Sequence, residues 1–109
     1  MQEAIRLPMR KEEMTDRMVR YWKKQGWYVI PTGDLNDSVS DFIILKDGMT
    51  AFVDIKYEGR KLYREKLKFE HDIEKHGGVY MYVGTPEEFK ICLAHIYGTQ
   101  DYSKCYADR

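Results

Sequence analysis

The chain has 109 residues, of which 43% are apolar and 14% aromatic. This composition is typical of one small folded domain and excludes a disordered tail. Its 18 basic and 18 acidic side chains give no net charge, which excludes a polybasic, histone-like protein but not a local basic patch. No apolar run approaches the roughly 20 residues of a membrane span, and two cysteines are too few for a disulfide framework. We therefore expect a single domain over residues 1–109 in a reducing cytosol.

Charge is distributed unevenly along the chain. Residues 1–26 carry seven basic and four acidic side chains, and residues 27–55 carry one and five. Residues 56–68 carry six and two, and residues 69–109 carry four and seven. An acidic middle therefore lies between two basic stretches. This pattern suits a metal site beside a phosphate-binding surface, although two solvated helix faces would produce it as well.

The first part of the chain predicts a helix followed by a strand. From about residue 11 to residue 25, apolar side chains recur at the spacing of one helical face; they are Met14, Met18, Tyr21 and Trp22. Gly26 is typical of the position just after a helix end. Residues 27–30 then predict a strand that Pro31 stops, and the polar, glycine-containing residues 31–40 predict a loop.

Two short apolar runs, Phe42–Leu45 and Ala51–Ile55, predict a β-hairpin. The Asp47-Gly48 dipeptide between them suits a type I′ turn, which needs positive φ at both central residues. If these two residues form the loop, the numbers of paired residues add up to 95, and Asp41 lies opposite Asp54. A four-residue loop preserves this register, whereas a three-residue loop breaks it.

The second half of the chain predicts a helix from about residue 63 to residue 76 and a strand over residues 79–83. A capping box at residues 85–88 opens a further helix. The order is then αβββαβα, with a core over about residues 12–97 and a polar tail over residues 98–109. It predicts an α/β fold in which a small mixed β-sheet is flanked by helices.

The predicted hairpin brings three charged side chains together at one end. Strand alternation places Lys56 on the same face as Asp54, while Asp41 faces Asp54 across the strands. Carboxylates in this position repel each other, and Mg²⁺, which takes carboxylate oxygens as ligands, offsets the repulsion. If repulsion dominates without metal, Asp54→Asn leaves the metal-free fold no less stable. The alternative is that Asp41 caps the start of its strand, with Asp54 and Lys56 as exposed edge charges.

Asp41, thirteen residues before Asp54-Ile55-Lys56 in an αβββαβ order, resembles the PD-(D/E)xK nuclease superfamily. Within that superfamily, the chain is similar to the small stand-alone VRR-NUC nucleases, many of which are phage-encoded. The segments that carry this similarity are Ser38–Asp41, Val53–Lys56 and Gly59–Leu62. The resemblance covers about residues 12–90 and implies a restriction-endonuclease-like core.

The resemblance also implies roles for individual residues. Asp41, Asp54 and the backbone carbonyl of Ile55 correspond to the ligands of Mg²⁺, for which Mn²⁺ would substitute, and Lys56 would handle the water and the phosphate. The family also uses a glutamate early in the first helix, where Glu12 fits best and Glu13 is its rival. Ordinary first-turn acids favoured by the helix dipole would look the same. The sequence departs from the family pattern at several positions: Ser38, Ser40, Asp54, Lys66 in place of a usual glutamine, and Pro31 in place of a common arginine.

A basic stretch follows the predicted metal strand directly. We interpret its cations as a nucleic-acid-binding surface, because Lys and Arg contact phosphates without reading sequence; they are Arg60, Lys61, Arg64, Lys66 and, further on, Lys68. A solvated helix face is the alternative. Other candidate residues give weaker signals. His71 and His76 do not have the spacing of two metal ligands on one helix. Cys92 lies on an apolar helical stripe, which is typical of a core residue.

Together, these features predict a Mg²⁺-dependent DNA endonuclease in the cytoplasm, or in the host cytoplasm if the chain is phage-encoded. The resemblance implies a homodimer that acts on branched or structured DNA such as Holliday junctions. Two alternatives stay open. One is a restriction- or repair-type nuclease with another DNA substrate, and the other is a catalytically inactive nucleic-acid-binding module of the same fold.

Overall fold

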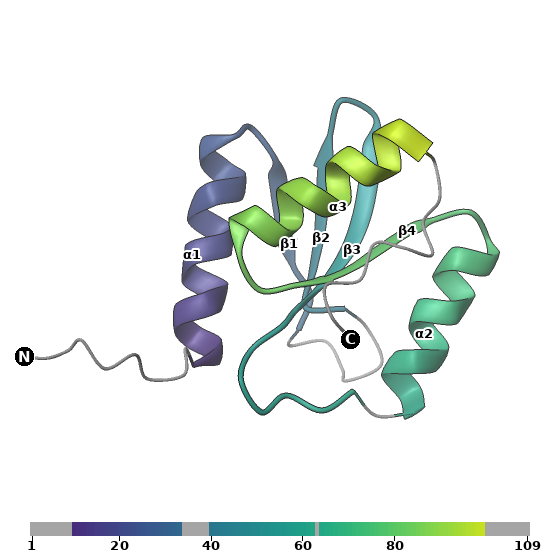
Figure 1. Cartoon of the computed structure of the whole chain (residues 1–109), viewed down its shortest axis with the longest axis horizontal. Helices are drawn as coiled ribbons and strands as arrows, with labels where there is room; N and C mark the ends of the chain where they lie inside the picture. The colour runs from purple at the N-terminus through teal and green to yellow at the C-terminus, as the bar shows by residue number, and fades with distance from the viewer. Residues whose placement is uncertain (1–9, 34–39, 63, 100–109) are drawn as a thin grey trace, which may run out of the picture.

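The computed structural model describes residues 10–33, 40–62 and 64–99 (Figure 1). The elements are α1 (Lys11–Lys24), β1 (Tyr28–Pro31), β2 (Phe42–Lys46), β3 (Met49–Ile55), α2 (Arg64–Lys75), β4 (Val79–Val83) and α3 (Pro86–Thr99). The strands form one sheet in the order β1-β2-β3-β4, in which only β3 and β4 are parallel. The predicted α/β fold, a small mixed sheet flanked by helices, is confirmed. Within the described part of the chain, no helix has the length and apolar character needed to cross a membrane.

The boundaries of the elements differ from the predicted ones by one or two residues. Pro31 does not stop β1 but is its last residue, which an edge strand tolerates because one side of its backbone needs no partner. Helix α3 continues to Thr99, so residues 98 and 99, predicted as the start of a polar tail, belong to the helix. The remaining tail, residues 100–109, lies outside the described residues, as does most of the predicted loop, residues 34–39.

The hairpin between β2 and β3 has the predicted turn and register. Asp47 has a φ of 51° and Gly48 a φ of 84°, as a type I′ turn requires. Lys46 pairs with Met49, and Phe42 at the far end of the pairing lies opposite Val53. Every pair adds up to 95, so the local turn chemistry sets which residues meet at the open end of the hairpin.

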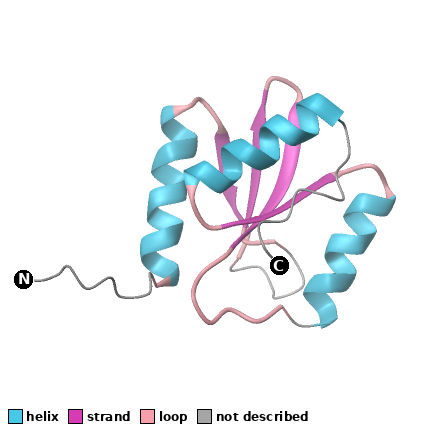
Figure 2. Cartoon of the chain, in the orientation of Figure 1, coloured by secondary structure: helices cyan, strands magenta, loops and turns pink. Residues whose placement is uncertain are grey.

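The two faces of the sheet are covered by different helices. On one face, α1 and α3 pack against alternate residues of β3 around Trp22 and Phe89, which are both fully buried. On the other face, α2 packs through Phe69, whose ring lies 5.8 Å from that of Phe52 and 6.4 Å from that of Tyr80. Helix α2 accordingly lies apart from α1 and α3 (Figure 2). The sheet therefore separates an apolar core, on the side of α1 and α3, from a more polar layer on the side of α2.

Cys92 belongs to the apolar core, as predicted. It is buried in α3, and burial together with the charge of Glu88 raises the pKa of its thiol to about 11. A protonated, inaccessible thiol has little nucleophilic character.

The backbone of Gly84 lies very close to the chain segment that leaves β3. The backbone N–H of Lys56 donates to the carbonyl of Val83 at 2.8 Å, which extends the pairing of β3 and β4 by one residue. A Cβ atom on Gly84 would lie 2.3 Å from the carbonyl oxygen of Lys56. Because backbone cannot yield like the end of a side chain, this position requires glycine.

We therefore expect Gly84→Ala to lower the free energy of unfolding by about 1–3 kcal/mol, the usual cost of overpacking. Gly33→Ala is the matched control, because its Cβ would meet its nearest neighbour, a carboxylate oxygen of Asp41, at an ordinary 3.6 Å. Urea unfolding of the two variants measures both effects. Equal midpoints for Gly84→Ala and the wild type would show that the two chain segments do not approach so closely.

Candidate functional site

Asp41 and Asp54 lie next to each other at the open end of the hairpin, as the register predicts. The backbone N–H of Asp41 donates to Oδ1 of Asp54 at 2.9 Å, and the N–H of Ile55 donates to Oδ2 of Asp41 at 2.8 Å. Asp54 is fully buried and Asp41 is nearly so. The structure therefore does not place Asp54 as an exposed edge charge, and each carboxylate is tied to the backbone of the other strand.

The backbone around Asp41 is held by its own hydrogen bonds. The N–H groups of Thr32 and Gly33 both donate to the carbonyl of Asp41, at 2.8 and 3.1 Å. The hydroxyl of Thr32 donates to the carbonyl of Ser40, and the hydroxyl of Ser40 donates to the carbonyl of Phe42. These bonds connect the end of β1 to the start of β2, so the position of Asp41 is determined by the sheet and not by the side chain alone.

The side chain of Arg60 contacts both members of this pair. Its Nη1 donates to Oδ2 of Asp41 at 2.7 Å and to the carbonyl oxygen of Ile55 at 2.6 Å, and its Nη2 lies 3.5 Å from Oδ1 of Asp54. The guanidinium thus contacts all three groups that the family resemblance implies as metal ligands. Arg60 is not an exposed residue of the predicted nucleic-acid-binding surface, because its side chain is only 9% exposed.

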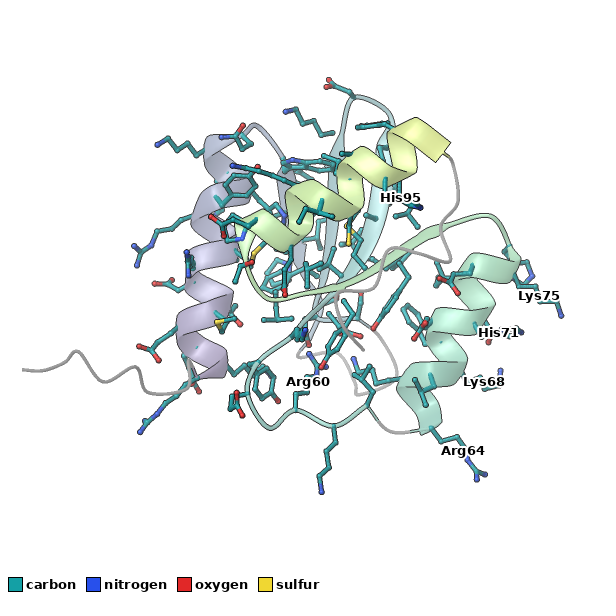
Figure 3. The ribbon with its side chains drawn as sticks, in the orientation of Figure 1. Arg60, Arg64, Lys68, His71, Lys75 and His95 are labelled. Carbon is teal, nitrogen blue, oxygen red and sulfur yellow. The ribbon has the colours of Figure 1, made fainter. Side chains whose placement is uncertain are left out.

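A turn after β3 directs Arg60 toward the carboxylates. The N–H of Arg60 donates to the carbonyl of Tyr57 at 3.1 Å, and Gly59 has a positive φ of 84°. The guanidinium carbon also lies 5.5 Å from the centre of the Tyr57 ring, within the range of a cation–π contact. Figure 3 shows Arg60 below the ends of the strands, away from the outer side of α2.

Lys66 and Tyr80 complete the surroundings of Asp54. The ammonium of Lys66, near the start of α2, lies 3.2 Å from Oδ1 of Asp54, and the hydroxyl of Tyr80 in β4 donates to Oδ2 at 2.5 Å. Lys66 was expected to contact nucleic acid, but its side chain is only 11% exposed and turns inward. In the sequence, Tyr80 alternates with the apolar residues Val79 and Met81, a pattern that sheet packing by itself would produce.

The surroundings of the two carboxylates shift the pKa values of Arg60 and Tyr80. Burial by itself would lower the pKa of Arg60, but the charge of Asp41, the hydrogen bond to it and the charge of Asp54 raise that pKa above its ordinary value. Burial and the charge of Asp54 raise the pKa of Tyr80 well above its ordinary value. The phenol therefore stays protonated and donates a hydrogen bond to Asp54. The two carboxylates are thus offset by the positive charges of Arg60 and Lys66.

The donor atoms around Arg60 suit a hard divalent cation. Two carboxylate oxygens and one backbone carbonyl oxygen face a single positively charged group, and Mg²⁺ prefers this kind of ligand. Asp41, Asp54 and Ile55 therefore fit the metal that the resemblance implies. A metal ion that used the same oxygens would have to take the place of the guanidinium, because both groups are positively charged.

The structure does not bring Glu12 to this pair. Glu12 is exposed in the first turn of α1, and among the described residues no group of three or more His, Cys, Asp or Glu side chains lies where it could hold a metal. Its rival Glu13 accepts a hydrogen bond from the N–H of Arg10 at 3.1 Å. A first-turn acid that caps the helix in this way is stabilised by the helix dipole.

Lys56 lines a cleft beside the carboxylates. Its ammonium lies 3.7 Å from Oε2 of Glu88 in α3, and its side chain is 27% exposed. Helix α3 covers the face of the sheet opposite to α2 and the partners of Asp54, so the prediction that Lys56 shares the face of Asp54 is wrong for its ammonium. The N–H of Gly84 donates to the other oxygen of Glu88. The cleft has a volume of about 710 Å³, and its lining includes Met14, Lys56, Tyr57, Arg60, Leu67 and Glu88. Arg60 therefore separates the cleft from the buried carboxylates.

Other exposed basic residues lie along α2. Two of the predicted nucleic-acid-binding residues are exposed; they are Arg64 and, just before the helix, Lys61. Exposed basic residues recur on α2 at intervals of four, three and four residues, which puts them on one helical face; they are Arg64, Lys68, His71 and Lys75. They project from the outer side of the helix (Figure 3). The predicted basic stretch ended at Lys68, and His71 was considered only as a metal ligand, so His71 and Lys75 were not recognised as members of this face.

The structure changes the expected effect of Asp54→Asn. The repulsion of two carboxylates by itself predicts no loss of stability, but Asp54 is the common partner of Arg60, Lys66 and Tyr80. We expect Asp54→Asn to cost about 3–5 kcal/mol in the absence of metal, because it leaves buried positive charge uncompensated. Unfolding in urea with EDTA measures this cost. The control is Asp72→Asn, which removes an exposed carboxylate paired with Lys68 and should change the midpoint little. An Asp54→Asn protein as stable as the wild type would contradict the charge pairing.

Neither a protein-family model, nor a curated protein, nor a solved structure matches this chain. A function for the protein must therefore be inferred from its residues and their geometry.

Proposed function

We propose that the protein is a divalent-metal-dependent DNA endonuclease that hydrolyses phosphodiester bonds, with Mg²⁺ as the cofactor and Mn²⁺ as a substitute. The observation that carries the proposal is the convergence of oxygens from Asp41, Asp54 and Ile55 on one cationic group beside a cleft. Paired carboxylates on a β-hairpin, next to a cleft with a lysine in its wall, are what metal-assisted hydrolysis requires.

Each group has a role in this proposal. Asp41, Asp54 and the carbonyl of Ile55 hold the cation, which when bound supplies Lewis-acid chemistry at a phosphoryl oxygen and activates water. Tyr80 holds the second oxygen of Asp54, so that carboxylate keeps one orientation. Lys56, in the wall of the cleft, provides positive charge that stabilises the charge developing on the phosphate.

DNA is the proposed substrate because the exposed face of α2 is basic. Its basic side chains follow a helix of 12 residues next to the cleft, a length over which phosphates of a DNA backbone could be contacted. Branched or structured DNA, Holliday junctions among them, and a homodimeric assembly remain part of the proposal through the family resemblance alone.

A catalytically inactive nucleic-acid-binding module is the second candidate. One observation favours it: Arg60 and Lys66 already offset the charges of the two carboxylates. In such a module the ion pairs would stabilise the fold, and α2 would still bind DNA. The two candidates therefore differ in whether divalent metal is needed.

Cleavage assays on duplex, single-stranded and four-way-junction DNA, with Mg²⁺ and with EDTA, separate them. We expect cleavage with Mg²⁺ only. Lys56→Ala should lower the cleavage rate by about 10²-fold or more and leave DNA affinity within a few-fold, since the charge acts in the transition state. Lys90→Ala, at an exposed position of α3, is the control and should cleave at the wild-type rate. If no substrate is cleaved with Mg²⁺ or Mn²⁺ while DNA binds equally well in EDTA, the inactive module is the correct assignment.

The basic face of α2 makes a separate prediction about binding. Arg64→Ala and Lys75→Ala should each weaken DNA binding regardless of sequence. Each should also reduce the slope of log K against log salt by about 0.7–0.9 for every phosphate that the variant no longer touches. Fluorescence anisotropy over a range of salt concentrations measures both quantities. Lys24→Ala, an exposed lysine at the end of α1, should leave the slope unchanged. Unchanged slopes for all three variants would place the DNA path elsewhere.

A further inference from the structure

The guanidinium of Arg60 touches all three groups proposed to hold the metal. Its Nη1 lies 2.7 Å from Oδ2 of Asp41 and 2.6 Å from the carbonyl oxygen of Ile55. A divalent cation that takes oxygen ligands binds them at about 2.0–2.6 Å. A metal on these oxygens would therefore occupy the same space as the guanidinium nitrogen. Two positive charges at that separation repel strongly in a buried site.

The position of Arg60 in the fold allows the guanidinium to leave. Arg60 lies on the segment between β3 and α2 and belongs to neither. Next to it, Gly59 has a positive φ and open space where a Cβ would be. Rotation of the Arg60 side chain about its own torsions could therefore move the guanidinium without breaking a strand or helix hydrogen bond.

The cleft offers a destination for the displaced side chain. Arg60 and Tyr57 both line it, and the Tyr57 ring lies within cation–π distance of the guanidinium carbon. A guanidinium is also a bidentate partner for a phosphate group, which the proposed substrate would bring into this cleft. Lys66, held on α2, keeps one positive charge beside Asp54 after Arg60 has left.

We propose that Arg60 is a built-in competitor of the divalent cation: its guanidinium occupies the oxygens of Asp41 and Ile55 until the metal displaces it into the cleft. This inference rests on the proposed function, since it assumes that these oxygens bind metal. In the metal-free protein Arg60 stabilises the buried carboxylates, and in the metal-bound protein it becomes a cation of the cleft wall.

The test is the affinity for Mn²⁺ alone, measured by electron paramagnetic resonance and by calorimetry. We expect Arg60→Gln to bind Mn²⁺ about tenfold or more tightly than the wild type, because the metal no longer has to break a buried ion pair. Lys61→Gln is the matched control: it removes the same charge from the next residue, which is exposed. It should bind Mn²⁺ like the wild type, which excludes a general effect of net charge.

The outcomes separate the two proposals. Equal Mn²⁺ affinity of the wild type and Arg60→Gln would overturn the competition and leave the proposed metal site standing. No Mn²⁺ binding by either protein at millimolar concentration would overturn the metal site and the competition together. Equally tighter binding by Arg60→Gln and Lys61→Gln would reduce the effect to net charge and overturn the competition as well.

A second measurement needs no variant, in case Arg60→Gln does not fold. The side-chain N–H groups of Arg60 donate to Asp41 and to Ile55, so their protons should exchange slowly with water in the metal-free wild type. Nitrogen-15 NMR during a Mg²⁺ titration should show these protons becoming fast-exchanging as the backbone signals of Asp41 and Ile55 shift. Saturation of those backbone shifts with the Arg60 signals unchanged would overturn the proposal.

Discussion

Two carboxylates buried side by side repel each other and lose their hydration, and both costs must be met by positive charge and hydrogen bonds. Asp41 and Asp54 are in this situation, with backbone N–H groups from the opposite strand reaching one oxygen of each. Arg60 and Lys66 supply the positive charge, and Tyr80 supplies a further hydrogen bond. These three residues come from three separate segments of the chain. The carboxylate pair therefore organises the polar end of the molecule.

The same requirement explains how the second layer of the fold is arranged. Helix α2 packs on the sheet through the apolar contact of Phe69 with Phe52 and Tyr80. One turn earlier along α2, Lys66 reaches Asp54. Residues 52 and 54 lie on the same face of β3, so one helix meets an apolar side chain and a charged one on neighbouring positions of that face. The polar cluster and the aromatic cluster support each other because both depend on the placement of α2.

Arg60 links stability to the proposed chemistry. A site built to bind a divalent cation carries excess negative charge, which destabilises the protein whenever the cation is absent. A guanidinium on the same oxygens removes that penalty in the metal-free state. Under the proposed function, metal binding would first have to break the ion pairs of Arg60, so tight internal pairing and tight metal binding would oppose each other. The balance between them is a property of Arg60, Asp41 and Asp54 together and not of any one residue.

The sequence by itself determined the elements and the meeting of the two carboxylates. Asp47-Gly48 can form only a narrow set of turns, and this local preference carries the register from Lys46 and Met49 to the open end of the hairpin. Apolar periodicity likewise determined the helices and strands to within a residue or two. These features follow from contacts between residues close in sequence.

The partners of the carboxylates were decided only by the tertiary structure. Tyr80 is 26 residues from Asp54 in the sequence. The side chain of Arg60 reaches the carboxylates because the segment after β3 turns back toward them. The side chain of Lys66 reaches Asp54 because α2 packs on the face of the sheet that carries Asp54. In the sequence, Arg60 and Lys66 are two cations in a basic stretch with no sign of which ones turn inward. That choice depends on which cations lie within reach of buried negative charge, a long-range electrostatic constraint that local periodicity does not contain.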